Sequence, residues 1–203
     1  MANSKPWDAQ LAYRLVYPLR NSVLTPNHFT IFRLLVGVVA CIGLAQGTYF
    51  WGNAGAICFA ISNFLDHTDG EFARITGKIS KFGHYFDLAS DAAVNVLLFV
   101  GIGIGLPDDG SLGDYAVPMG ATAGVAVAAI FHMRAHIEMS IGKEQARQPH
   151  YGGFEAEDVL YLLPLITFFN QQAAFLMLAS IGAPLFCLWV LKEFLALKKK
   201  LPA

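Results

Sequence analysis

The chain has 203 residues and a formal net charge of −1, and 55% of its residues are hydrophobic but only 14% are charged. Soluble domains carry about 25% charged residues, so this composition favours one integral membrane domain and gives no reason to expect nucleic-acid binding. Cys41, Cys58 and Cys187 all lie in apolar stretches without a CxxC motif, which argues against a disulfide framework and a zinc site.

The first predicted element is an amphipathic helix over residues 6–20, inside an N-terminal segment, 1–25, at the membrane surface. Trp7, Leu11, Leu15 and Leu19 recur every four residues, and polar residues lie off this stripe. Such a stripe is typical of a helix in the membrane–water interface. The segment lacks the apolar core and cleavage site of a signal peptide, so we expect the helix to be retained.

Six apolar segments follow within residues 27–196, and each predicts a transmembrane helix. They cover residues 27–47, 50–74, 80–106, 115–141, 154–169 and 172–196. The fifth contains Pro164 and has only about 16 residues, close to the lower limit for spanning. Gly101, Gly103 and Gly105 in the third segment favour close helix packing. The predicted fold class is thus all-α integral membrane, with residues 1–203 forming a single domain of six transmembrane helices preceded by the interfacial helix.

The charged residues predict that both termini face the cytosol. The proposed external loops, 47–49, 107–114 and 170–171, contain no Lys or Arg, whereas Asp108, Asp109 and Asp114 lie there. This asymmetry follows the positive-inside rule. Five spans would put the C-terminal lysines outside, so six are favoured. We expect a multi-pass protein whose active site and termini face the cytosol, in the inner membrane if the organism is bacterial.

Four aspartates recur at helical spacing near the cytosolic ends of the second and third spans. Asp66 and Asp69 are three residues apart and Asp87 and Asp91 four apart, so each pair lies on one face of its helix. A carboxylate at bilayer depth is costly and faces a cavity, a partner or an ion. Four carboxylates balance two divalent cations, and oxygen-only ligands suit Mg²⁺ or Mn²⁺. The sequence therefore predicts a site for two metal ions.

The aspartates belong to a longer pattern, D-x2-D-G-x2-A-R-x8-G-x3-D-x3-D, which runs from Asp66 to Asp91. At these positions the chain resembles the CDP-alcohol phosphatidyltransferases, integral-membrane enzymes that move a phosphoalcohol from a CDP-linked donor onto a hydroxyl and release CMP. The resemblance implies a transferase of phospholipid synthesis, dependent on Mg²⁺ or Mn²⁺, that works as a homodimer among membrane lipids. CDP-diacylglycerol is the favoured donor. A CDP-amino alcohol with a lipid acceptor is the alternative within the class, and a divalent-cation transporter is the alternative outside it.

The resemblance also implies a role for each motif position. Asp66, Asp69 and Asp87 would be metal ligands, and Asp91 would be both a ligand and the general base for the attacking hydroxyl. The nucleotide side of the site would comprise Asn27, Thr30, Gly70, Ala73, Arg74, Ser80 and Gly83. Among these, the glycines and the alanine are small where a nucleotide needs close approach, and Arg74 offers a fixed cation for the diphosphate.

The acceptor alcohol is left open by the sequence, and Arg134 is the first candidate to contact it. This residue lies between His132 and His136, after a long uncharged stretch. A cation at that depth faces the cavity or a partner, and a guanidinium there suits an anionic group such as a phosphate. A pair with Glu138 at i,i+4 is the competing interpretation.

A second candidate for the acceptor is the acidic start of the fifth span. Glu155, Glu157 and Asp158 lie there, either to stabilise the N-terminus of the helix or to receive a cationic amino alcohol. Glycerol-phosphate synthases that resemble this chain usually carry Pro after the third motif aspartate and Lys after the fourth. Leu88 and Ala92 stand at these places, which argues against that activity.

Overall fold

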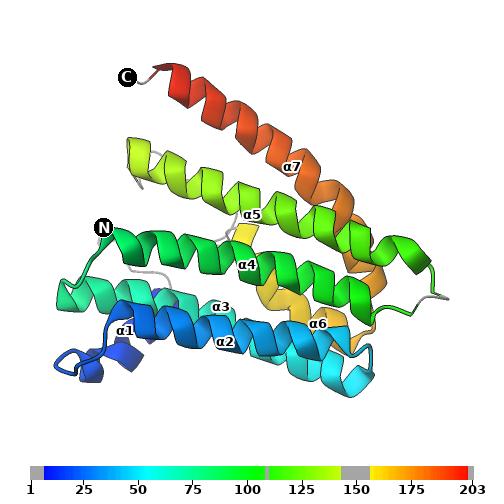
Figure 1. Cartoon of the computed structure of the whole chain (residues 1–203), viewed down its shortest axis with the longest axis horizontal. Coiled ribbons are helices and arrows are strands. Elements are labelled where there is room, and N and C mark those ends of the chain that lie inside the picture. Colours follow the sequence, from blue (N-terminus) through cyan, green and yellow to red (C-terminus); the bar gives the residue numbers. More distant parts are fainter. Residues whose placement is uncertain (1–6, 108–109, 143–155, 201–203) are drawn as a thin grey trace.

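The computed structural model describes residues 7–107, 110–142 and 156–200, and every regular element in these ranges is a helix. The α-helices are α1 (Trp7–Val16), α2 (Pro26–Ala45), α3 (Tyr49–Thr76), α4 (Lys81–Gly105), α5 (Ala116–Ile141), α6 (Leu163–Phe168) and α7 (Gln172–Lys200). Short 3₁₀ helices cover Tyr17–Leu19, Gly113–Tyr115 and Ala156–Leu162. Helices α2 to α5 run in alternating directions, and α7 packs mainly along α5 (Figure 1).

Within the described residues, four helical stretches are long and apolar enough to cross a membrane: Pro26–Ala45, Lys81–Gly105, Gly113–Ile141 and Gln172–Lys198. The all-helical class is thus confirmed, whereas the predicted number of six spans is not. Helix α3 has 28 residues, or about 42 Å, more than the ~30 Å of a hydrocarbon core. Its composition is less apolar because its C-terminal half carries the charged residues of the aspartate motif.

The predicted fifth span, 154–169, is short and irregular. Residues 154 and 155 lie outside the described ranges, and the rest forms the 3₁₀ helix Ala156–Leu162 followed by α6. Pro164 stands in the first turn of α6, where its ring and missing N–H disrupt a continuous α-helix. The two elements together measure about 23 Å, which is less than the hydrocarbon core. They pack against α3.

The predicted interfacial helix is shorter than residues 6–20. Helix α1 ends at Val16, and a 3₁₀ turn with Pro18 in its first positions follows. The helix packs against α3, and Ala12 and Val16 are fully buried. Leu11 and Leu15, from the predicted apolar stripe, are about half exposed. A location of these leucines at the membrane surface stays a prediction.

Glycines bring α4 close to its neighbours. A Cβ atom added to Gly105 would lie 2.1 Å from the carbonyl oxygen of Leu44, and one on Gly101 would lie 2.8 Å from that of Cys41. Gly103 is similarly close to the first residue of α5. These contacts confirm the packing role predicted for the three glycines. They fix α4 between α2 and α5, which positions the aspartates on α4.

One end of the bundle collects the motif residues. The end of α3, the start of α4, the ends of α5 and α7, and α1 all lie at the same end (Figure 1). Gly77, with a φ of 66°, ends α3 in the left-handed conformation that glycine tolerates best. The Ser80 hydroxyl then caps α4 by accepting a hydrogen bond of 2.9 Å from the N–H of Gly83. This tight turn places the two aspartate pairs side by side.

Candidate active site

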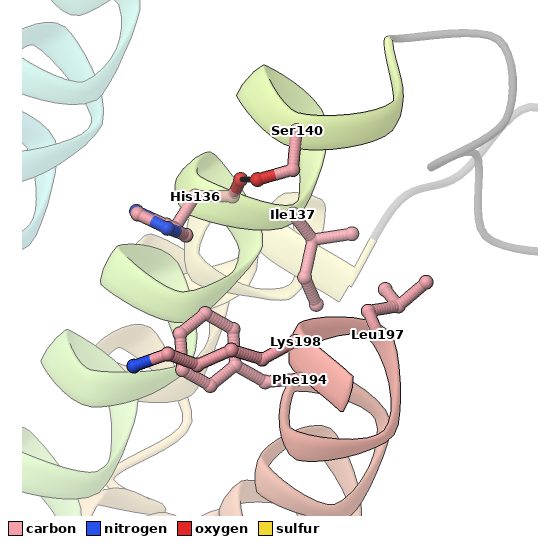
Figure 2. A pocket seen from close by; sticks show the side chains of 6 residues that line it. All are labelled: His136, Ile137, Ser140, Phe194, Leu197 and Lys198. Carbon is pink, nitrogen blue, oxygen red and sulfur yellow. Dashed lines mark hydrogen bonds between the residues drawn. The ribbon is translucent and has the colours of Figure 1, made fainter. Parts of the chain in front are cut away.

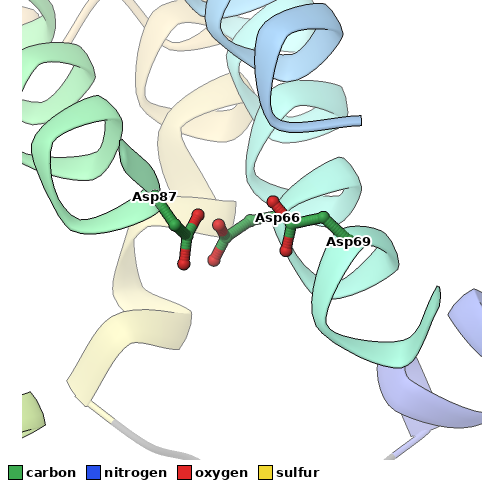
Figure 3. A group of neighbouring side chains, drawn as sticks. All are labelled: Asp66, Asp69 and Asp87. Carbon is green, nitrogen blue, oxygen red and sulfur yellow. The ribbon is translucent and has the colours of Figure 1, made fainter. Parts of the chain in front are cut away.

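Three of the four motif aspartates meet between α3 and α4. Asp66 and Asp69 of α3 and Asp87 of α4 point toward one another (Figure 3), and one carboxylate oxygen of each lies within 4.8 Å of the other two. In the described part of the chain, the buried Oδ1 atoms of Asp66 and Asp87 accept no hydrogen bond. Converging buried carboxylates are costly without a positive charge beside them, so this group suits a cation.

Arg33 of α2 completes the cluster. Its Nη1 lies 2.8 Å from Asp66 Oδ1 and its Nη2 lies 3.8 Å from Asp87 Oδ1, and the same Nη2 donates a hydrogen bond to Asp91. The Arg33 side chain is only 3% exposed. The sequence prediction missed this residue. A signal for it exists, because Arg33 is a lone arginine in the first apolar segment and a charge at that depth needs a partner.

Thr30 lies one helical turn before Arg33 and reaches the other side of the cluster. Its buried hydroxyl donates a hydrogen bond of 2.6 Å to Asp69 Oδ2. A contact of Thr30 with the nucleotide, which the family resemblance implies, stays a prediction. In the structure its hydroxyl orients Asp69, because a hydrogen bond to a charged carboxylate fixes the rotamer of that side chain.

Three residues assigned to the nucleotide side come together at the start of α4. A Cβ atom on Gly83 would lie 2.8 Å from Asn27 Oδ1 and 3.0 Å from Ser80 Oγ. Lys78 ties this turn to the segment before α2, because its ammonium donates a hydrogen bond of 2.8 Å to the carbonyl of Leu24. Because Gly83 has no side chain, no atom at that place separates the polar groups of Asn27 and Ser80.

Gly70 directly follows Asp69 on α3, and Arg74 lies one turn further on the same face. The Arg74 guanidinium lies 3.7 Å from the position that a Gly70 Cβ would occupy. It also donates a hydrogen bond of 2.9 Å to the carboxylate of Glu71, whose side chain is 3% exposed, whereas that of Arg74 is 60% exposed. Arg74 thus presents an anchored cation at the exposed rim, with the partly buried Ala73 beside it.

Arg134 contacts α7 in the structure. Its Nη1 lies 3.6 Å from a carboxylate oxygen of Glu193, and its guanidinium lies 5.8 Å from the ring centroid of Trp189. The structure does not describe the side chains of Glu138, Glu157 and Asp158, and Glu155 lies outside the described residues. The two hypotheses on the acceptor therefore both stay predictions.

A small pocket lies near Arg134, between the ends of α5 and α7. Figure 2 shows that its lining comes from three residues of each helix: His136, Ile137 and Ser140, and Phe194, Leu197 and Lys198. The His136 ring packs edge-on against that of Phe194, with 5.4 Å between centroids. The accessible walls of the pocket are almost entirely apolar, so the pocket alone does not indicate the charge of a ligand.

A sequence comparison gives the family. The profile of the CDP-alcohol phosphatidyltransferases matches residues 23–195, which is most of the chain and includes every aspartate of the motif. The chain belongs to the CDP-alcohol phosphatidyltransferase family. It is therefore an enzyme of a membrane-bound transferase family, and this assignment favours transfer chemistry over the cation transporter.

Three relatives match parts of this transferase. An archaetidylinositol phosphate synthase of Pyrococcus horikoshii is 32% identical over 107 residues, which are 52% of this chain and 54% of the relative. Bifunctional IPC transferase and DIPP synthases of Archaeoglobus fulgidus and Aquifex aeolicus are 28% and 35% identical, over 56% and 35% of this chain and 22% and 16% of the relatives. The matches thus span about half of the first relative and smaller shares of the other two.

The residues of this phosphatidyltransferase fit a divalent metal ion. The converging donors are carboxylate oxygens, which suit Mg²⁺ and Mn²⁺, and the buried Oδ1 of Asp87 accepts no hydrogen bond in the described part of the chain. Asp66, Asp69 and Asp87 would hold one ion. Asp91 is adjacent, but its oxygen is bonded to Arg33.

Proposed function

We propose that this enzyme transfers a phosphatidyl group from a CDP-diacylglycerol-type donor to a hydroxyl acceptor and releases CMP. The observation that carries the proposal is the cluster of three carboxylates, with Asp91 next to it, between the end of α3 and the start of α4. Bound divalent cations would neutralise the diphosphate of the donor and stabilise the departing phosphate. A site at this depth is accessible both to a lipid-borne group and to a nucleotide from the aqueous phase.

Asp91 is the proposed general base. The carboxylate accepts the proton of the acceptor hydroxyl, and the hydroxyl oxygen forms a bond to the phosphorus that bears the lipid. The bond from this phosphorus to the bridging oxygen of the diphosphate breaks, and CMP leaves with that oxygen. Asn95 supports the helix at this point, because its side chain donates a hydrogen bond of 3.0 Å to the Asp91 carbonyl.

The CDP moiety is proposed to bind between the start of α4 and the rim of α3. Asn27 and Ser80 offer polar groups beside Gly83, which is small enough for a ring to approach the backbone. Arg74, anchored by Glu71, offers its guanidinium to a phosphate of the donor. Thr30 belongs to the same region through its hydrogen bond to Asp69.

We further propose an anionic acceptor, such as a polyol phosphate, held near Arg134. The cationic groups of Arg134 and Lys198 support it, because they lie on α5 and α7 toward the end of the bundle that carries the aspartates. The name of the Pyrococcus horikoshii relative, an archaetidylinositol phosphate synthase, is consistent with a phosphorylated polyol. A cationic amino alcohol against the acidic residues 155–158 is the competing proposal.

The oligomeric state and orientation belong to the same proposal. We infer a homodimer from the family, and α7 offers a surface for it, since Leu178, Ile181, Leu185 and Leu188 are all exposed on the isolated chain. The active site and both termini are proposed to face the cytosol because the proposed external loops contain no Lys or Arg.

The decisive experiment measures CMP release from purified enzyme with CDP-diacylglycerol and with an ether-lipid CDP donor of the archaetidyl type. The acceptor panel contains inositol phosphate, glycerol phosphate, free inositol, serine and ethanolamine. The proposal expects release with a phosphorylated polyol and loss of acceptor affinity, by about a hundredfold, in Arg134→Ala. Release only with an amino alcohol, with unchanged acceptor affinity in Arg134→Ala, would contradict the anionic acceptor.

A further inference from the structure

The four aspartates form two overlapping groups. Asp66, Asp69 and Asp87 face one another within 4.8 Å. Asp66, Asp87 and Asp91 instead surround the guanidinium of Arg33, which lies 2.8 Å from Asp66 and 3.8 Å from Asp87 and is hydrogen-bonded to Asp91. The two groups share Asp66 and Asp87. The second group is therefore already occupied by a cation that belongs to the protein.

Arg33 is held at this place by its own backbone. Its carbonyl oxygen accepts a hydrogen bond of 2.8 Å from the buried Ser62 hydroxyl of α3. One turn later, a Cβ atom on Gly37 would lie 2.8 Å from a methyl carbon of Val94 on α4. Helix α2 is therefore fixed against both helices that carry the aspartates, and the guanidinium can leave them only by a change of its side-chain rotamer.

A guanidinium and a divalent ion compete for the same oxygens. Arg33 reaches one oxygen of each of the three surrounding carboxylates, and Mg²⁺ requires ligand oxygens at about 2.0–2.1 Å. An ion cannot take the Asp91 oxygen while Arg33 is bonded to it. A second ion in this group must therefore displace the guanidinium.

We propose that Arg33 is the resting occupant of the second cation position, so that the enzyme without donor binds one divalent ion, at Asp66, Asp69 and Asp87. The second ion enters when the CDP donor is present. Four carboxylates against one guanidinium and one divalent ion leave about one negative charge, and a second ion changes this to about one positive charge while the displaced guanidinium stays beside the carboxylates. The diphosphate of the donor compensates that positive charge, which favours the second ion only in its presence. This inference rests on the proposed function.

The test counts bound Mn²⁺ by electron paramagnetic resonance on the purified full chain in detergent. Without nucleotide, the wild type should bind one Mn²⁺ tightly, and addition of CDP should raise the count to two. Arg33→Met removes the charge and the guanidinium and keeps an unbranched, shorter side chain. It should bind two Mn²⁺ without CDP, the second at least about tenfold more tightly than the wild type does.

Arg20→Met is the matched control for a lost guanidinium, since Arg20 is exposed and its guanidinium donates a hydrogen bond of 3.1 Å to the Tyr17 carbonyl oxygen. Without nucleotide it should bind one Mn²⁺, like the wild type. Two Mn²⁺ of similar affinity in the nucleotide-free wild type would overturn the proposal, and so would a count that stays at one with CDP. Both outcomes are measured on the wild type, so they test the proposal even if Arg33→Met does not fold. CMP release on the same preparation tests the proposed function separately.

Discussion

The carboxylates of the cluster have two kinds of partner, a hydroxyl and a shared guanidinium, and these partners set different chemical roles. Asp69 accepts a hydrogen bond from Thr30, Asp91 accepts one from Arg33, and Asp87 lies at the longer distance of 3.8 Å from Arg33. A neutral hydroxyl leaves Asp69 with its full negative charge for a metal ion. A guanidinium, in contrast, already neutralises part of the charge of Asp91.

At this scale we predict that Thr30→Val weakens metal binding. The variant removes the hydrogen bond of 2.6 Å that orients Asp69. Hydrogen bonds to charged groups contribute about 1.5–3 kcal/mol, so Mn²⁺ affinity without nucleotide should fall by roughly ten- to a hundredfold. Thr122→Val is the control, because the Thr122 hydroxyl only bonds the carbonyl of Pro118 on its own helix. Equal Mn²⁺ affinities of the two variants would exclude the orienting role of Thr30.

Asp91→Asn should remove nearly all turnover and leave binding of the CDP donor largely intact. Loss of a general base costs about 100- to 10,000-fold in rate. Donor binding survives because Asp66, Asp69 and Asp87 still form the first cation position. CMP release gives the rate, and equilibrium binding of a labelled CDP donor gives the affinity. A variant with the wild-type rate would exclude Asp91 as the base.

The sequence predicted the residues that the motif names but not the residue that neutralises them. The spacings of Asp66, Asp69, Asp87 and Asp91 fix their helix faces, because the period of an α-helix is known in advance. Arg33 is 33 positions before Asp66 and lies on another helix. Its pairing depends on how α2 rotates against α3 and α4, and no local pattern gives that rotation.

At the scale of helices, backbone contact joins α2 and α4 at the end of the bundle opposite the aspartates. We predict that Gly105→Ala destabilises the fold, since the new Cβ would lie 2.1 Å from the Leu44 carbonyl oxygen, and neither backbone can yield freely. Overpacking costs about 1–3 kcal/mol, which should lower the melting temperature in detergent by roughly 5 °C.

Gly182→Ala on α7 is the control for this change. A Cβ there meets nothing within 4 Å among the described residues, and alanine has the higher helix propensity. Its melting temperature should therefore equal or exceed that of the wild type. Identical melting temperatures for Gly105→Ala and the wild type would show that α2 and α4 are not in contact at this point.

Element lengths were predicted well where the apolar stretch is continuous and poorly where it is broken. Helices α2, α4 and α5 begin and end within a few residues of the predicted segments. The predicted segment 154–169 differs because Pro164 restricts the backbone locally, and hydropathy alone does not register that restriction. In α3 the apolar character is lowered by Asp66 and Asp69, because these motif residues belong to the candidate site.

For the whole molecule, the alternating helix directions predict that both termini lie on the same side of the membrane. The starting end of α2 and the final end of α7 lie at one end of the bundle (Figure 1). The absence of Lys and Arg from the proposed external loops predicts that this end faces the cytosol. Reporter fusions at each terminus should therefore both report the cytosol. Reporters on opposite sides would show that the segment containing Pro164 does not cross.

The central claim is that the aspartate cluster performs a metal-dependent transfer that releases CMP. The most direct measurement follows CMP release by the purified enzyme with a CDP-lipid donor and a productive acceptor, first in excess EDTA and then after addition of Mg²⁺ or Mn²⁺. The converging carboxylates predict no CMP in EDTA and recovery of the full rate with either ion. Full turnover in excess EDTA would contradict the claim.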